Sequence, residues 1–102
     1  MSNLFSIVEL NIKPQERDAY MDALRALISD SRTTGAIVSH KLHIAPNNPS
    51  KCVVTVRWAS KEAMSDYQNG DLIKNFMNET AFCLADPSIY KTFTIESEQT
   101  LL

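Results

Sequence analysis

The hydrophobic period of the chain changes several times between two residues and about 3.6 residues, and the order of these changes restricts the fold more than any other feature. Four segments have the alternating pattern of β-strands: residues 4–12, 36–44, 51–58 and 88–97. Three segments have the spacing of amphipathic helices: residues 13–32, 61–68 and 72–84. The order β, α, β, β, α, β, with the second helix broken in two, predicts an α+β ferredoxin-like domain. Such a domain has one antiparallel sheet with its helices on one face.

Single residues predict where these segments begin and end. Pro14 suits the first turn of the first helix, Ser60 can cap the second, and Gly70 can end it. The Pro/Asn-rich stretch at residues 45–50 separates two strand patterns and predicts a hairpin turn.

In each predicted strand the residues of one parity are more apolar than the others, and we expect the helices to cover this face. The residues expected under the helices are Val8, Leu10, Ile12, Val38, His40, Leu42, Ile44, Cys52, Val54, Val56, Trp58, Ile89, Phe93 and Ile95. The opposite face has its own apolar side chains: Phe5, Ile7, Ile37, Val53 and Tyr90. A whole sheet face of this kind is too apolar for water, so we expect a second copy of the chain to cover it.

The composition fits one small globular domain. A chain of 102 residues with 44% hydrophobic and 22% charged residues is about one domain long, and we place its core at residues 4–96 and a tail at residues 97–102. The net charge of -2 comes without a basic stripe, which argues against a nucleic-acid partner. No window approaches the roughly 20 apolar residues that span a bilayer, and no signal segment is visible. We therefore expect no membrane partner and a cytoplasmic location.

The sequence offers little that could hold a cofactor. His40 and His43 are three residues apart, which places them on opposite faces of a strand, and no third metal ligand has a suitable spacing. Two glycines cannot build a glycine-rich phosphate loop. Cys52 and Cys83 are expected to be buried free thiols. We therefore expect neither a metal ion nor an organic cofactor.

His40 is the one residue that titrates near neutral pH in the apolar row expected under the helices. The predicted hairpin brings it close to Trp58 on the same face. An imidazole beside an indole under helices can form the wall of a small-molecule pocket, in which His40 would be the catalytic residue. In the alternative, His40 is a core residue that bonds a backbone carbonyl or Tyr20.

Three aromatic residues are candidates for binding the substrate. Trp58 ends a strand, Tyr67 lies at the end of the short helix, and Phe76 lies on the apolar stripe of the next helix. Together they could close a cavity around an aromatic ring. The alternative is that all three only fill the core, because aromatic residues at helical spacing usually pack.

The segment GAIVSHKLHIAPNNPSKCVVTVRWASKEAMSDYQNGDLIKNFM, residues 35–77, resembles the antibiotic biosynthesis monooxygenase-like family of dimeric α/β barrel proteins. The shared features are a strand after a helix-ending Gly, a Pro-bounded hairpin turn, a strand ending in Trp, and an S-x-E-A helix start; the likeness runs over about residues 4–96. The resemblance implies a homodimer whose sheets pack together, with a pocket between sheet and helices in each subunit. Family members include cofactor-independent oxygenases of quinols and polycyclic phenols, haem-degrading enzymes and a signalling-molecule isomerase.

Several positions depart from the family pattern. Val56 stands where many members have Glu, and Tyr67 stands where many have His. Val54 replaces the Asn of the polyphenol oxygenase branch, and Met77 replaces the histidine iron ligand of the haem-degrading branch. The resemblance therefore does not extend to haem degradation.

Three functions follow from these observations. The first is a cofactor-independent monooxygenase-like enzyme that acts on a small aromatic or quinone-type compound, with His40 as the base or oxyanion partner. The second is a non-redox isomerase or lyase of a small carbonyl compound, in which His40 moves a proton. The third is a non-catalytic dimeric binding module, which a fully packed interior would favour.

Overall fold

The computed structural model describes residues 3–95. Its four strands are β1 (Leu4–Asn11), β2 (Ile37–Ala45), β3 (Asn48–Trp58) and β4 (Ile89–Thr94). They form one sheet in the order β2-β3-β1-β4, in which each neighbouring pair is antiparallel. The predicted ferredoxin-like βαββαβ arrangement is therefore confirmed. Residues 96–97 of the last predicted strand and the predicted tail lie outside the described residues.

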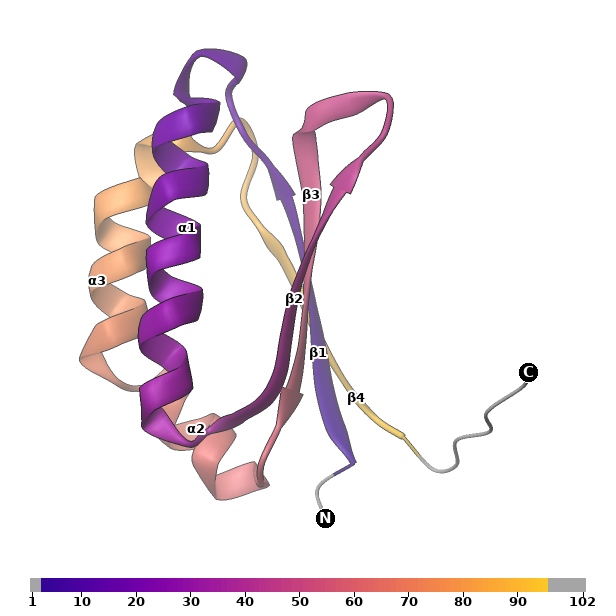
Figure 1. Cartoon of the computed structure of the whole chain (residues 1–102), viewed down its shortest axis with the longest axis vertical. Helices are drawn as coiled ribbons and strands as arrows, with labels where there is room; N and C mark the ends of the chain where they lie inside the picture. The colour runs from indigo at the N-terminus through magenta and orange to yellow at the C-terminus, as the bar shows by residue number, and fades with distance from the viewer. Residues whose placement is uncertain (1–2, 96–102) are drawn as a thin grey trace.

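The helices lie together on one face of the sheet, as Figure 1 shows. They are α1 (Arg17–Ser31), α2 (Lys61–Gln68) and α3 (Asp71–Thr80). Short 3-10 turns flank them: η1 (Pro14–Glu16), η2 (Arg32–Thr34) and η3 (Ala81–Cys83). The other face of the sheet is left without cover from residues 3–95.

Local sequence explains the ends of these helices. Pro14 stands in the first turn of η1, where its missing N–H costs nothing. The chain leaves η2 at Gly35, whose φ of 72° is open to glycine at little cost. The Ser60 hydroxyl accepts a hydrogen bond of 3.0 Å from the Ala63 N–H, as the sequence predicts for a helix cap.

The core lies between the helices and the inner face of β1 and β3. Its buried hydrophobic residues are Leu10, Ile12, Tyr20, Met21, Leu24, Leu27, Ala36, Cys52, Val54, Val56, Trp58 and Cys83. Both cysteines are free and buried, as expected. Burial raises the pKa of both thiols, so they are present in the core as neutral groups.

The predicted face assignment is correct for β1 and β3 but wrong at the start of β2. Ile37 pairs with Trp58, whereas Ser39 pairs with Arg57, so the register shifts between these pairs. A bulge of this kind turns the residues before it to the opposite face. Ile37 therefore packs against the core, and Val38 is 65% exposed.

The predicted face assignment is also wrong for β4. Tyr90 pairs with Val8 and therefore lies on the inner face, while Phe93 pairs with Phe5 on the outer face together with Ile89. All six residues of β4 are exposed, so neither face is well buried. Hydrophobicity alone could not choose between two exposed faces. Instead, hydrogen bonds to Ser6 hold the inner face of the strand.

Candidate functional site

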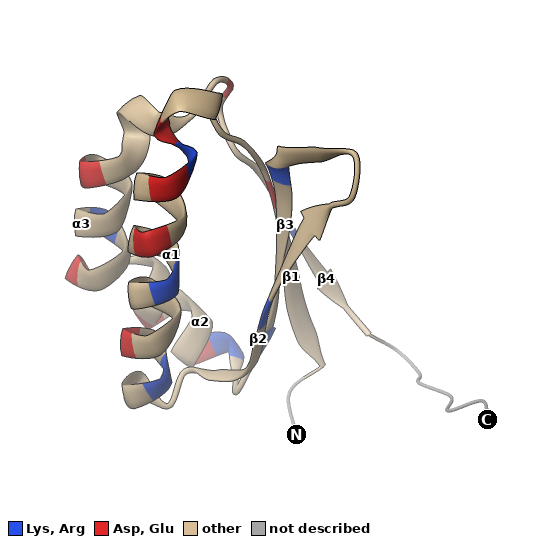
Figure 2. Ribbon diagram, turned by 45° about the horizontal axis from the view of Figure 1, so that its top comes forward, with Lys and Arg blue, Asp and Glu red and all other residues tan. Residues whose placement is uncertain are grey.

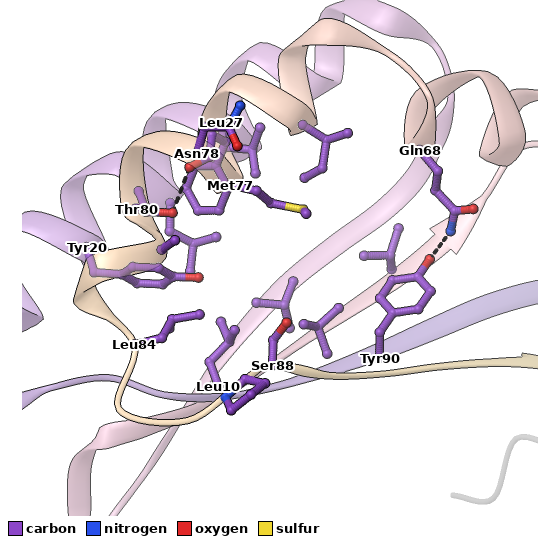
Figure 3. A pocket seen from close by; sticks show the side chains of 18 of the residues that line it. Leu10, Tyr20, Leu27, Gln68, Met77, Asn78, Thr80, Leu84, Ser88 and Tyr90 are labelled. Atoms are coloured by element: carbon purple, nitrogen blue, oxygen red, sulfur yellow. Dashed lines mark hydrogen bonds between the residues drawn. The ribbon is translucent and has the colours of Figure 1, made fainter.

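A cavity of about 920 Å³ lies between the inner face of the sheet, α1 and α3, and is completed by the loop at residues 84–88 and the start of β4. Figure 3 shows a part of its lining from close by. The side chains around it are mostly aliphatic and aromatic. Exposed residues on the lining, such as Met77 and Tyr90, show that the cavity opens to solvent. Its size and apolar lining are those of a small-molecule site.

All four residues predicted for the site line this one cavity. They come from separate elements: His40 from β2, Trp58 from the end of β3, Tyr67 from α2, and Phe76 from α3. The inner-face positions of the strands and the apolar stripes of the helices explain why these residues meet.

His40 lies opposite Val56 on the inner face of the sheet and is half-buried. Its Nδ1 atom is buried and has no hydrogen-bond partner among residues 3–95. Burial, and to a lesser degree the positive charge of Arg32, lowers the pKa of His40. The imidazole is therefore neutral at neutral pH. The alternative was a hydrogen bond from His40 to a backbone carbonyl or to Tyr20. No such bond of His40 is present among residues 3–95.

Trp58 belongs to the core and to the cavity wall at once. The residue is only 2% exposed, and its indole N–H donates a 2.8 Å hydrogen bond to the Ser6 hydroxyl. Its ring lies 5.4 Å from the ring of Tyr67, centroid to centroid, in a tilted arrangement. The tryptophan at the end of β3 therefore fixes one aromatic wall of the cavity and has its polar atom satisfied.

Tyr67 and Phe76 are each held by a partner on α1. The Tyr67 hydroxyl lies 2.7 Å from the Ser31 hydroxyl, which in turn donates to the Leu27 carbonyl. Phe76 packs edge-on against Tyr20, with 5.7 Å between ring centroids. Burial raises the pKa of Tyr67, so this residue is a neutral hydroxyl group in the site.

Tyr20 adds a second polar group to the cavity. Figure 3 shows its hydroxyl directed into the cavity. No residue in the range 3–95 forms a hydrogen bond with this hydroxyl, although the residue is almost fully buried. Burial also raises its pKa, which keeps it protonated. A ligand could therefore find both a hydrogen-bond donor in Tyr20 and a proton acceptor in His40.

Sequence reasoning missed Ser6, a buried residue that bonds two residues of the cavity lining, Trp58 and Tyr90. Ser6 is 0% exposed and bonds Tyr90 at 3.0 Å and Thr92 at 2.9 Å besides Trp58. The Gln68 amide donates in turn to the Tyr90 hydroxyl, as Figure 3 shows. The sequence does contain a sign of this role, because Ser6 is the one hydroxyl residue among the apolar residues on the inner face of β1. A buried hydroxyl requires a hydrogen-bond partner.

No group of three or more His, Cys, Asp or Glu side chains in the described part of the chain is placed to hold a metal ion. No helix within residues 3–95 is long and apolar enough to cross a membrane.

The fold and the cavity define a small ferredoxin-like protein with a cavity between its sheet and its helices. The family model described as antibiotic biosynthesis monooxygenase matches residues 4–79, and the chain therefore belongs to this family. The family resemblance seen in the sequence is confirmed. No curated protein matches the chain.

Solved structures show the same fold at low sequence identity. A protein from Deinococcus radiodurans has a TM-score of 0.88 at 10% identity, over 97% of this chain and 98% of that chain. Rv0793 from Mycobacterium tuberculosis has a TM-score of 0.85 at 18% identity, over 95% and 98% of the two chains. A structure named antibiotic biosynthesis monooxygenase has a TM-score of 0.84 at 15% identity, over 92% and 99%. The TM-scores establish the shared fold, and at such low identities the likeness leaves the substrate open.

Proposed function

We propose that the chain is an enzyme that oxidises a small aromatic or quinone-type compound with dioxygen and uses neither a metal ion nor an organic cofactor. The observation that carries this proposal is the position of His40. A neutral imidazole with an unpartnered, buried nitrogen lines an apolar cavity with aromatic walls. Membership of the antibiotic biosynthesis monooxygenase family supports the reaction class.

In the proposed reaction, His40 accepts a proton from a hydroxyl or an activated C–H group of the substrate. The substrate anion passes an electron to dioxygen, and a carbon–oxygen bond then forms. One oxygen atom remains as a new carbonyl group and the other leaves as water, so a CH2 group becomes C=O. The substrate supplies all the electrons, and no further reductant is needed.

The aromatic residues hold the substrate in this proposal. Trp58, Tyr67 and Phe76 enclose its ring, and the Tyr20 hydroxyl donates a hydrogen bond to the oxygen on which negative charge develops. The open cavity lacks the filled interior that would favour a non-catalytic module.

Oxygen uptake tests the reaction class. The protein is incubated with a panel of quinols and polycyclic phenols in an oxygen electrode, and the products are analysed by mass spectrometry in the presence of ¹⁸O₂. The proposal expects oxygen consumption with one labelled atom in the product. Turnover without oxygen uptake would replace the proposal with the isomerase or lyase alternative.

The pH dependence of turnover should show His40 as the base. Because burial lowers the pKa of His40, the imidazole is neutral at neutral pH and becomes protonated only below the ordinary histidine value of about 6.5. We expect kcat/KM to be constant above this value and to fall as the pH drops through the lowered pKa. Initial rates from about pH 5 to 8 measure this limb. A fall of kcat/KM centred above about pH 6.5 would contradict the assignment of His40 as the base.

We also propose that two copies of the chain pair through the outer faces of their sheets, as a dimeric α/β barrel. The support is the exposed apolar surface on that face. Phe93 is 44% and Ile89 51% exposed, and the Phe93 ring lies 5.6 Å from that of Phe5, centroid to centroid. Apolar side chains gathered on one uncovered sheet face are typical of an interface.

Phe93→Asp should convert this dimer to a monomer. A carboxylate buried at an apolar interface loses its hydration without gaining a partner, which would weaken the dimer by roughly 100-fold or more. Size-exclusion chromatography with light scattering measures the mass. The matched control is Phe82→Asp, because Phe82 is 59% exposed but lies in η3 among the helices. A monomeric parent protein, or an unchanged mass for Phe93→Asp, would refute the proposed interface.

A further inference from the structure

A second cavity, of about 330 Å³, lies between α1 and β2. Six residues line it: Arg25, Ile28, Ser29, Arg32, His40 and Leu42. Three of them come from α1 and Arg32 begins η2; these four lie at helical spacing along one side of this segment, and the two from β2 share the inner face of the sheet. This crevice is therefore built by regular elements that the fold holds in place.

The crevice brings together two arginines that form no ion pair within residues 3–95. Neither Arg25 nor Arg32 forms an ion pair with a carboxylate of residues 3–95, where the recorded pair is Arg17–Asp18. Figure 2 shows that α1 also carries acidic residues. Asp22 is three residues before Arg25, within reach of a helical ion pair, yet the two side chains do not pair.

His40 connects this crevice to the main cavity, because its ring lines both. The buried Nδ1 atom of the ring has no partner among the described residues, and a buried polar atom without a partner is costly. The positive charge of Arg32 acts on the ring and helps to lower its pKa. Most exposed arginines are simply hydrated, but these two share a cavity with an unsatisfied imidazole.

We propose that this crevice binds an oxyanion, a carboxylate or a phosphate group, between Arg25, Arg32 and the Ser29 hydroxyl. Guanidinium groups bind such oxygens through paired, charge-assisted hydrogen bonds, and the hydroxyl adds a neutral donor. The oxyanion is either free or an acidic group of a molecule that lies in the main cavity and extends past His40. This site is independent of the oxygen chemistry proposed above, because it requires only binding.

Histidine NMR spectra of the protein test the site without any turnover. The probe is inorganic phosphate, added at constant ionic strength with chloride as the exchanged ion, and the readout is the ring carbon–proton signals of the two histidines. We expect a saturable shift of the His40 signal and no shift of the His43 signal, because His43 lies on the outer face, bonded to Thr55. The signals are assigned from the spectrum of His40→Gln.

The variant for this test is the double substitution Arg25→Gln and Arg32→Gln, which should weaken phosphate binding by about tenfold or more. Lys74→Gln is the control, because Lys74 is an exposed cation on α3 that does not line the crevice. Circular dichroism verifies that each variant is folded. A second arm of the experiment compares the binding of two aromatic compounds, the acid 4-hydroxyphenylacetate and the neutral 4-ethylphenol.

The two arms separate the two sources of the oxyanion. Tighter binding of the acid than of the neutral phenol, lost in the double variant, assigns the site to an acidic group of the cavity ligand. Equal binding of both aromatics, with saturable phosphate binding, assigns it to a free anion. If neither phosphate nor the acid shows binding that depends on the two arginines, the proposal is wrong, whatever the oxygen electrode shows.

Discussion

His40→Gln should lower kcat/KM by about 10²- to 10⁴-fold, which is the usual contribution of a general base. Glutamine keeps much of the shape and polarity of the side chain but cannot take up a proton. Because His40 forms no hydrogen bond with residues 3–95, the substitution breaks none, and the protein should remain folded. Initial rates with a confirmed substrate, together with a thermal unfolding curve, measure both effects.

The chain contains a matched control for this experiment. His43 lies on the neighbouring stretch of β2 but faces outward, where its ring bonds Thr55 at 3.3 Å. His43→Gln should leave kcat/KM within about twofold of the parent value, because surface substitutions usually change little. Full activity of His40→Gln, or an equal loss in both variants, would remove His40 from the mechanism. The pH limb below about 6.5 should be absent from His40→Gln alone.

Trp58→Ala should reduce the free energy of unfolding by about 3–5 kcal/mol, the usual cost of deleting a buried tryptophan side chain. The substitution removes a 2% exposed ring from the core and leaves a space that Tyr67 and the strands can fill only in part. Urea unfolding followed by far-UV circular dichroism measures the difference, since the variant lacks the fluorescent indole.

Two milder substitutions separate the packing of Trp58 from its hydrogen bond. Trp58→Phe keeps most of the apolar contact, and Ser6 retains Tyr90 and Thr92 as partners, so the loss should be only about 1 kcal/mol. Ser6→Ala leaves the indole N–H buried without an acceptor and should cost about 1–3 kcal/mol. If Trp58→Ala costs no more than Trp58→Phe, the indole is only a cavity wall and not part of the core.

The sequence could place the candidate residues close together because the position of each depends on a regular period. Alternation along β2 and β3 places His40 and Trp58 on one face, and the helical stripe places Phe76 above them. These periods are insensitive to a shift of one residue at either end of an element. That these residues meet on the inner side of the sheet could therefore be predicted before any coordinates.

The predictions that were wrong concern features that depend on pairing between segments distant in the sequence. The bulge that exchanges Ile37 and Val38 arises from the fit of β2 to β3, and the register of β1 with β4 sets the face of Tyr90. The hydroxyl contacts of Ser6 follow from the same register. A pattern along one segment contains no information on its offset from another.

The four strands are not tied to the molecule with equal strength. β4 pairs with one neighbour only, and on its inner face Tyr90 and Thr92 contact the sheet through hydroxyl groups instead of buried hydrocarbon. Separation of this strand would break few apolar contacts and leave β1 and β3 under the helices intact. Within a single chain, β4 is therefore the wall of the cavity with the fewest apolar contacts to break, whereas the proposed dimer would also hold its outer face through Ile89 and Phe93. In such a chain, a cavity under helices can open along one edge strand without a hinge between domains.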